Sequence, residues 1–298
     1  MTDASEEHAA ARYLSAKRSV DDRARDRRVK ASLLDALPAT PRVLEAGSGA
    51  GFAMPTLLEW GLEPASYAGV DADAGVVSFA RWMLPRLLRR RGYGVTATER
   101  GCRLESDAPV GFETGDALER LPKLAPAGGA ELLLAQSFFD LVPLEEALDA
   151  FERAVAPDGL VYAPSTFDGE TIFLPEHPAD APVIEAFHAD MDGDPGRDSR
   201  VGRHLIDGLR HRGASLEAVG ASDWVVRPTP AAGRGDGPGY RADERHFLAT
   251  ILGFVADAAA DVEGGSELAS QRRAQLAAGE LSYIAHGYDL LWRPRADP

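Results

Sequence analysis

The sequence predicts an α/β fold in which a mostly parallel sheet is flanked by helices. Three observations support this prediction. Short apolar runs alternate with stretches of helical spacing through residues 42–163, as in successive βαβ units. A glycine-rich turn directly follows the first apolar run. The chain has 298 residues, 45% of them hydrophobic, which is enough for one large domain or one domain with a smaller appendage.

The N-terminal part is expected to be a helical segment. Residues 12–37 show part of a helical stripe and many basic side chains, and two prolines follow. We therefore divide the chain into an N-terminal helical segment, 1–37, and a single domain, 38–298. The basic side chains are expected on a solvated helix face. The first eleven residues are polar and acidic, unlike a signal peptide.

The first half of the domain alternates regularly. We expect strands at 42–46, 66–71, 110–114, 131–136 and 160–163, and helices at 52–60, 74–91 and 144–154. The run at 131–136 is almost entirely apolar, which is typical of a strand buried on both faces.

The second half is less regular. Residues 164–200 are rich in Pro, Gly and Asp, with one expected helix near 183–191. Further helices are expected at 201–212, 243–262 and 266–278, a sixth strand within 214–226 and a last strand at 281–292. The sheet is thus completed late, around helical insertions at about 164–212 and 228–279. The apolar helix at 243–262 suits core packing and a homodimer contact equally well.

The net charge and the cysteine content restrict which binding partners and metal sites we expect. A net charge of −15 repels phosphate backbones, so nucleic acid is an unfavourable partner. No apolar stretch approaches the roughly 20 residues that span a bilayer, so we expect a cytoplasmic protein without a membrane partner. Cys102 is the only cysteine, which excludes an internal disulfide and a Cys-rich metal site. It lies in an expected connection, 100–103, and an incidental thiol is favoured over a nucleophile.

The turn at 47–51 carries the main chemical signal. Glycines at 47, 49 and 51 allow a tight turn and a close approach of backbone to a ligand. Twenty residues later the second strand ends in Asp71, where such folds hydrogen-bond ribose hydroxyls. Dinucleotide oxidoreductases and adenosylmethionine enzymes share this arrangement. The dinucleotide fingerprint G-x-G-x-x-G fits poorly, because the glycines here are spaced by single residues.

The stretch EAGSGAG at 45–51 resembles motif I of the class I S-adenosylmethionine-dependent methyltransferases, and Asp71 is similar to their ribose-binding acid. ETGDA at 113–117 resembles their third motif, in which Asp116 would contact the adenine amine. AQSFF at 135–139 occupies the place of the fourth motif, and APDGLV at 156–161 resembles the turn into strand five. The resemblance covers about half of the chain. It implies a Rossmann-like sheet of seven strands, the last antiparallel, and S-adenosyl-L-methionine as cofactor.

The resemblance also implies a set of cofactor-binding residues. These are Glu45, Gly47, Ser48, Gly49, Gly51, Asp71, Ala72, Asp116, Ala117, Gln136 and Ser137. Glu45 and the backbone near Gly47 would suit the ammonium group, and Ala72 and Ala117 would form apolar walls. Many family members place an N-terminal helix over the cofactor as a lid. Tyr13 and Lys17, four residues apart on one helix face, are the candidates there for the methionine carboxylate.

Methyl transfer needs in-line positioning and sometimes a base. The fourth motif lacks the Asn/Asp-Pro-Pro-Tyr/Phe of enzymes that methylate amino groups of bases and glutamine, and no Pro-Cys pair is present for cytosine C5 chemistry. His286 and His188, each beside aromatic residues, are the candidate bases. The acids near His177 are a weak signal for metal-assisted chemistry, and no metal is expected. Trp224, beside Asp223, suits a pocket for a ring or amine, or core packing.

Four functions remain open. The first is transfer of a methyl group from S-adenosyl-L-methionine to a small-molecule acceptor through O, N or C. The alternatives are a methyltransferase of protein or RNA that docks through residues 12–30, an NAD(P)-dependent oxidoreductase, and a non-catalytic adenosylmethionine-binding module.

Overall fold

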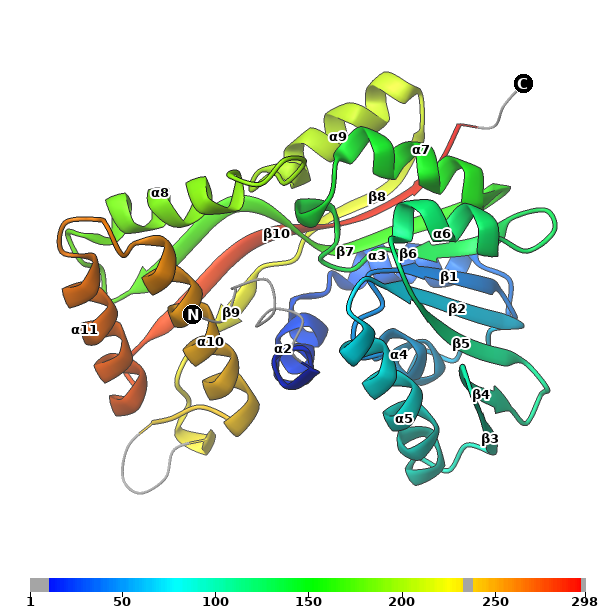
Figure 1. Ribbon diagram of the computed structural model, residues 1–298, viewed down its shortest axis with the longest axis horizontal. Helices are drawn as coiled ribbons and strands as arrows, with labels where there is room; N and C mark the ends of the chain where they lie inside the picture. Colours follow the sequence, from blue (N-terminus) through cyan, green and yellow to red (C-terminus); the bar gives the residue numbers. More distant parts are fainter. Residues whose placement is uncertain (1–10, 233–237, 296–298) are drawn as a thin grey trace.

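The computed structural model describes residues 11–232 and 238–295, which form one ten-stranded sheet covered by helices (Figure 1). The strand order is β3-β4-β5-β2-β1-β6-β7-β10-β8, and β9 pairs with β10. The parallel part consists of β1 (Arg42–Ala46), β2 (Ser66–Asp71), β5 (Pro109–Thr114), β6 (Ala130–Leu134) and β7 (Val155–Leu174). The last strand, β10 (Ser282–Arg293), is antiparallel to β7. The predicted mostly parallel sheet with an antiparallel last strand is confirmed, with more strands than the seven expected.

Two of the additional strands form a hairpin at one edge of the sheet. β3 (Val95–Thr98) pairs with β4 (Gly101–Leu104), and β4 pairs with β5. The expectation that 100–103 is a connection is therefore wrong. Cys102 and Leu104 are buried while Arg103 between them is exposed, so one face of β4 contributes to the core. Four residues are too few for this alternation to be recognised in the sequence.

Strand β7 is much longer than predicted. It was expected to end at residue 163, but it continues to Leu174. The N-terminal half of β10 pairs with this continuation through bulges, and β9 (Trp224–Val226) pairs with β10. We call residues 165–174, 224–226 and 282–288 the extension. It projects past the carboxyl ends of the other parallel strands (Figure 1). The Gly- and Asp-rich composition concealed this strand, because its pairing partner lies more than 100 residues away.

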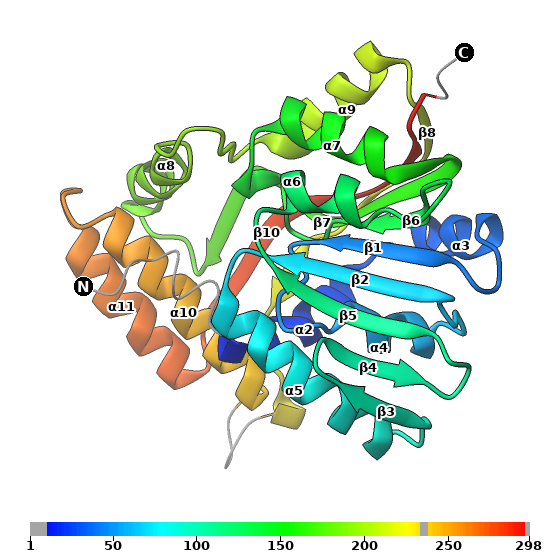
Figure 2. The ribbon, with the colours of Figure 1, turned by 45° about the vertical axis from the view of Figure 1, so that its right-hand side comes forward.

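Helices cover both faces of the sheet (Figure 2). On one face α3 (Arg27–Ala36), α4 (Ala53–Glu59) and α5 (Ala74–Arg90) pack into one core cluster. On the other face α6 (Ala117–Leu124), α7 (Leu144–Ala154) and α9 (Val201–Arg212) pack into another, and β8 (Ser215–Ala221) forms the outer edge. Sequence reasoning did not predict α6.

Three helices form a cap on the extension: α8 (Asp180–Met191), α10 (Ala242–Ala258) and α11 (Gly265–Ala278) (Figure 1). The apolar side chains of α10, such as Phe247 and Ile251, are buried in the core of this cap. Helix α2 (Ala11–Ala24) packs against α10 and β9. The helical segment predicted at 12–37 is therefore two helices, α2 and α3, divided at Arg25 and Asp26.

Among residues 11–232 and 238–295, no helix has the length and apolar character needed to cross a membrane. The polar stretch expected at the extreme N-terminus, 1–10, lies outside the described residues.

Candidate functional site

The glycine-rich turn connects β1 to α4 at the carboxyl edge of the sheet. Its glycines adopt positive φ angles of 62° at Gly47, 50° at Gly49 and 77° at Gly51. A Cβ atom would lie 2.9 Å from the Phe138 ring at position 47 and 2.8 Å from the Phe112 ring at position 51. Both the backbone conformation and the close packing therefore require glycine.

Asp71 connects this turn to the end of β2. Its Oδ2 accepts a hydrogen bond from the Gly49 amide at 2.8 Å, and its Oδ1 accepts one from the Asp73 amide at 3.0 Å. Burial raises the pKa of Asp71, and these two amides oppose the rise. Each carboxylate oxygen can accept a second hydrogen bond. Asp71 thus orders the turn and retains acceptor capacity for a ligand.

Glu45, the first acid of the turn sequence, is 3% exposed. Its carboxyl accepts a hydrogen bond from the Tyr67 hydroxyl on the neighbouring strand. Burial raises the pKa of Glu45 to about 8. At neutral pH this carboxyl is therefore mostly protonated, whereas sequence reasoning assigned it to an ammonium group as a charged acid.

The expected adenine-side residues lie at the same edge of the sheet, because Asp71 pairs with Thr114 at the ends of β2 and β5. Asp116 is exposed and caps α6, accepting a hydrogen bond from the Leu118 amide at 2.8 Å. Ala117 is buried and Ala72 is exposed. The structure therefore places these residues at one edge of the sheet.

Gln136 and Ser137 follow β6 and contact α2. Gln136 Nε2 donates to Asp21 Oδ2 at 2.8 Å, and its Oε1 accepts from Arg25 at 2.9 Å. Ser137 adopts a φ of 47°, and its hydroxyl donates to the Ser165 carbonyl at 3.2 Å. The end of β6 is therefore joined to both α2 and β7.

Helix α2 lies over the glycine turn, and it contacts the end of β6 through Lys17 and the cap through Tyr13. Lys17 Nζ donates to Ser137 Oγ at 2.8 Å, lies 3.1 Å from Asp21 Oδ2 and sits 4.7 Å from the Trp224 ring centroid. Tyr13 is buried among cap residues, with its ring stacked on Phe247. The two candidates for the methionine carboxylate thus face different neighbours.

A cavity of about 80 Å³ lies between α2 and the glycine turn. Lys17, Asp21 and Arg25 line it from the helix, and residues 47–50 line it from the turn. Four polar atoms of its lining residues are buried without a hydrogen-bond partner among the described residues: Ser48 Oγ, Asp21 Oδ1, Arg18 Nε and Arg25 Nε. Such atoms cost free energy when left unpaired, so the cavity suits a polar group.

Sequence reasoning missed Asp21 and Arg25 as members of this site. The available signal was their spacing, because Lys17, Asp21 and Arg25 recur every four residues on one helix face. The basic residues here were instead expected on a solvated face, yet Lys17 is only 7% exposed.

The two candidate bases lie on opposite faces of the extension. His286 Nδ1 lies 2.7 Å from Asp223 Oδ1, and its ring meets Tyr288 edge-on at 4.9 Å. Strand alternation turns His286 away from the cap, because its neighbour Ala285 is part of the cap core. His188 on α8 lies 3.1 Å from Thr171 Oγ1, and burial lowers its pKa. The structure therefore does not bring the two histidines together.

The acidic loop does not assemble a metal centre. Asp168 forms an ion pair with Arg203 at 2.9 Å, and the His177 amide donates to Asp180 at 2.7 Å. Within residues 11–232 and 238–295, no group of three His, Cys, Asp or Glu side chains is arranged to hold a metal ion.

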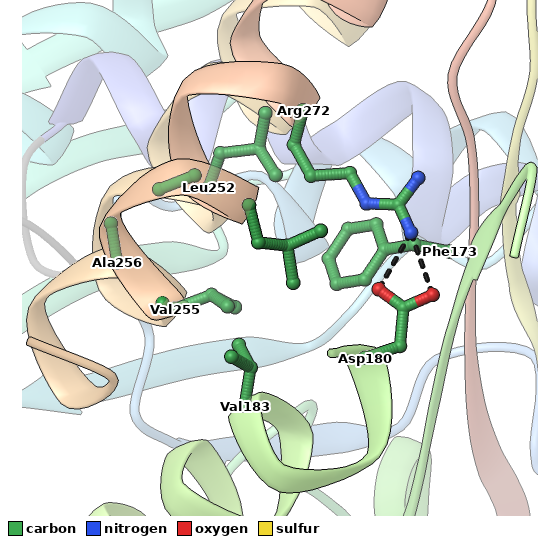
Figure 3. Close-up of a pocket in the computed structure, with 10 residues that line it drawn as sticks. Phe173, Asp180, Val183, Leu252, Val255, Ala256 and Arg272 are labelled. Atoms are coloured by element: carbon green, nitrogen blue, oxygen red, sulfur yellow. Dashed lines mark hydrogen bonds and ion pairs between the residues drawn. The ribbon is translucent and has the colours of Figure 1, made fainter. Parts of the chain in front are cut away.

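A second hollow of about 10 Å³ lies inside the cap, between α8, α10 and α11 (Figure 3). Arg272, only 2% exposed, extends toward Asp180 and makes two contacts of 2.6 Å with its carboxylate. The hollow has room for about one water molecule. We interpret it as part of the packing that joins α11 to α8.

No family model and no curated protein matches this chain. Among solved structures, it is similar to BH2331 of Bacillus halodurans C-125, provisionally described as a methyltransferase, with a TM-score of 0.51, 11% identity and coverage of 90% of this chain and 99% of that one. It is also similar to an S-adenosylmethionine-dependent methyltransferase from Thiobacillus denitrificans in complex with S-adenosyl-L-homocysteine. The TM-score is 0.46 and the identity 15%, with coverage of 91% of this chain and 93% of that one. The [4+2]-cyclase SpnF has a TM-score of 0.44 and 16% identity, with coverage of 90% of this chain and 82% of that one. The likeness to BH2331 shows a shared Rossmann-like α/β fold.

Proposed function

We propose that this chain is an S-adenosylmethionine-dependent methyltransferase acting on a small-molecule acceptor. The observation that carries the proposal is the joined unit of the glycine turn and Asp71, held by the bond between the Gly49 amide and Asp71 Oδ2. A turn that exposes backbone, with an acid fixed beside it, suits an adenosine ligand. Fold alone does not establish function, so the proposal rests on this site.

The residues around the cavity fit the cofactor. Asp71 would bind the ribose, and Asp116 and Ala117 would contact the adenine. The unpaired atoms of Ser48, Asp21 and Arg25 fit the ammonium and carboxylate groups of the methionine end. We also assign Gly47, Gly51, Gln136 and Lys17 to this end, with Tyr13 and Glu45 in supporting positions. At about 80 Å³ the cavity is smaller than pockets that hold whole ligands of this size, so we assign only the methionine end of the cofactor to it.

The cofactor supplies an electrophilic methyl group, and the residues of this chain bind, orient and exclude water. Between the two histidines, we take His286 as the base because of its ring contacts, with the acceptor on the face of the extension that is turned away from the cap. Asp223 holds Nδ1, which leaves Nε2 as the acceptor atom. His188 contacts Thr171 beside α8, and burial opposes its protonation.

A small-molecule acceptor is favoured over protein or RNA by how three arginines of the 12–30 stretch are used. Arg18 pairs with Glu59 at 3.2 Å, Arg23 with Glu244 at 2.7 Å, and Arg25 binds Gln136. These three side chains are engaged in contacts within the chain, which reduces the charge that they offer to an external protein or RNA.

Calorimetric titration of the full chain with S-adenosylhomocysteine, S-adenosylmethionine and NAD tests the proposal. We expect micromolar binding of the two adenosyl sulfur ligands and no heat from NAD. Binding of NAD alone would place the chain among the oxidoreductases. Absence of binding for all three ligands would also overturn the proposal.

A further inference from the structure

Asp289 on β10 is a fully buried carboxylate to which the proposed function assigns no role. Its Oδ2 accepts hydrogen bonds from the Asp26 amide at 2.9 Å and the Tyr162 hydroxyl at 3.1 Å. Its Oδ1 accepts one from the Ser165 amide at 3.0 Å. A buried carboxyl with three donors fixes the segments that carry those donors relative to one another.

The first of these segments is the base of α2. Asp26 lies between α2 and α3, and its side chain caps α3 by accepting hydrogen bonds from the Arg28 and Val29 amides. The Asp26 amide is bound to Asp289. The point about which α2 would turn is thus attached to the sheet through Asp289.

The second segment leads back to the middle of α2. The Ser165 carbonyl accepts from Ser137 Oγ at 3.2 Å, and Ser137 Oγ accepts from Lys17 Nζ at 2.8 Å. The path Lys17–Ser137–Ser165–Asp289–Asp26 begins and ends on the same short stretch of chain, residues 17–26. We call these five residues the ring.

Backbone strain is present at two members of the ring. Ser137 has a φ of 47° and Ser165 a φ of 56°, conformations that residues other than glycine rarely adopt. Such conformations persist where surrounding contacts impose them, and they occur often at functional and switching sites. Here the two strained serines are bonded to each other and to the helix that covers the glycine turn.

We propose that Asp289 is a positioning residue that holds α2 closed over the glycine turn, acting through Ser165 and Ser137 on Lys17. In this arrangement, breaking the contact between Lys17 and Ser137 and rotating α2 about Asp26 occur together. This role of Asp289 in closure needs no bound ligand. Its effect on ligand release rests on the proposed function. The competing interpretation is that Asp289 only strengthens the pairing of β10 with β7.

Opening of α2 can be measured without a ligand through a cysteine placed under it. Ala16 is 3% exposed on the packed face of α2, and the native Cys102 is 1% exposed. In full-length Ala16→Cys protein, the rate of labelling by a thiol reagent reports how often α2 opens. Into this background we would introduce Ser137→Ala, Asp289→Asn and both together.

Matched controls lie outside the ring. Ser270→Ala removes a hydroxyl that bonds only within α11, and Asp168→Asn alters another buried carboxylate of the same sheet. We expect Ser137→Ala and Asp289→Asn each to accelerate labelling about five- to tenfold, the effect of losing one hydrogen bond. The controls should change it less than about twofold. The double variant should resemble the stronger single variant, because a ring is opened by its first break.

Three results would overturn the proposal. Unchanged labelling in Asp289→Asn, with a lowered melting temperature, would leave Asp289 a role in strand pairing only. Unchanged labelling in Ser137→Ala would show that Lys17 does not hold the helix. If the two single-variant accelerations of labelling multiplied in the double variant, Ser137 and Asp289 would act as independent contacts. Dissociation of S-adenosylhomocysteine should be faster in the same variants. If the parent does not bind that ligand, the proposed function fails, while the labelling experiment still decides the ring.

Discussion

The Gly49 amide donates to Asp71 Oδ2 at 2.8 Å and so joins the turn after β1 to the end of β2. We expect Asp71→Ala to weaken binding of S-adenosylhomocysteine by about 1–3 kcal/mol. The turn loses the hydrogen bond that orders it, and the ribose loses a hydrogen-bond acceptor. Asp73→Ala is the control, since Asp73 caps α5 two residues further on. It should lower stability by about 1 kcal/mol and leave affinity unchanged. Titration calorimetry with equal affinity for Asp71→Ala and the parent would contradict the ribose assignment.

The buried carboxyl of Glu45 makes stability depend on pH. Its pKa is about 8 in the fold, against 4.5 ordinarily, so the folded chain retains a proton that the unfolded chain releases. This contribution is complete below about pH 4.5 and is lost as the pH rises through about 8, by up to roughly 1.4 kcal/mol per pH unit. Glu45→Gln cannot ionise and retains a group for the Tyr67 hydroxyl.

Urea unfolding of the parent and Glu45→Gln at about pH 5 and about pH 8 measures this contribution. We expect the variant to be the more stable protein at the higher pH, with the difference shrinking at the lower pH. Asp21 and Asp289 also have raised pKa values, and their effect cancels in the comparison because both proteins contain them. A difference that is constant across the range would show that Glu45 is not the titrating group.

A buried ion pair joins α11 to α8 in the cap. Arg272 is 2% exposed, bonds both carboxylate oxygens of Asp180 and also donates to the Pro175 carbonyl at 2.7 Å. Asp180→Ala should lower the free energy of unfolding by about 3–5 kcal/mol, because it leaves a buried charge unpaired. Asp207→Ala breaks the exposed pair with Arg210 and should cost about 0–1 kcal/mol. Similar denaturation midpoints for the two variants would show that the buried pair does not hold the cap.

The single thiol should be inert in the folded chain. Cys102 is 1% exposed on β4, and burial raises its pKa to about 11, so thiolate is scarce at neutral pH. Titration with a chromogenic disulfide should detect no thiol in the native protein and one thiol per chain after unfolding. Rapid labelling of the native protein would disprove this burial and restore the nucleophile interpretation.

Local patterns account for the parts of the site that could be predicted. Gly47, Gly49 and Gly51 alternate with single residues in one turn, and Asp71 ends the adjacent strand, so spacing alone places them together. The contact of Asp21 with Gln136 spans 115 positions, and no local pattern encodes such a pair. The long strand β7 was missed for the same reason. Its second half is stabilised by β10, and its own composition favours turns.

His286 and Asp223 form a histidine–carboxylate pair on the extension. His286 is oriented by Asp223 at 2.7 Å, so His286→Ala should lower kcat about 10²–10⁴-fold for any acceptor that the parent methylates. The affinity for S-adenosylhomocysteine should not change, because His286 lies outside the cofactor cavity. Asp223→Asn should give a smaller loss of kcat, since it removes orientation and not the base.

The matched control is the surface pair of His204, on α9, with Asp198, which precedes that helix; the two lie 2.5 Å apart. His204→Ala should leave kcat unchanged, which separates loss of a base from loss of any histidine–carboxylate pair. His188→Ala tests the competing candidate, whose imidazole is held by Thr171 and disfavoured as a base by burial. Because the two candidate histidines lie on opposite faces of the extension, the variant that loses kcat also identifies the face from which the acceptor approaches.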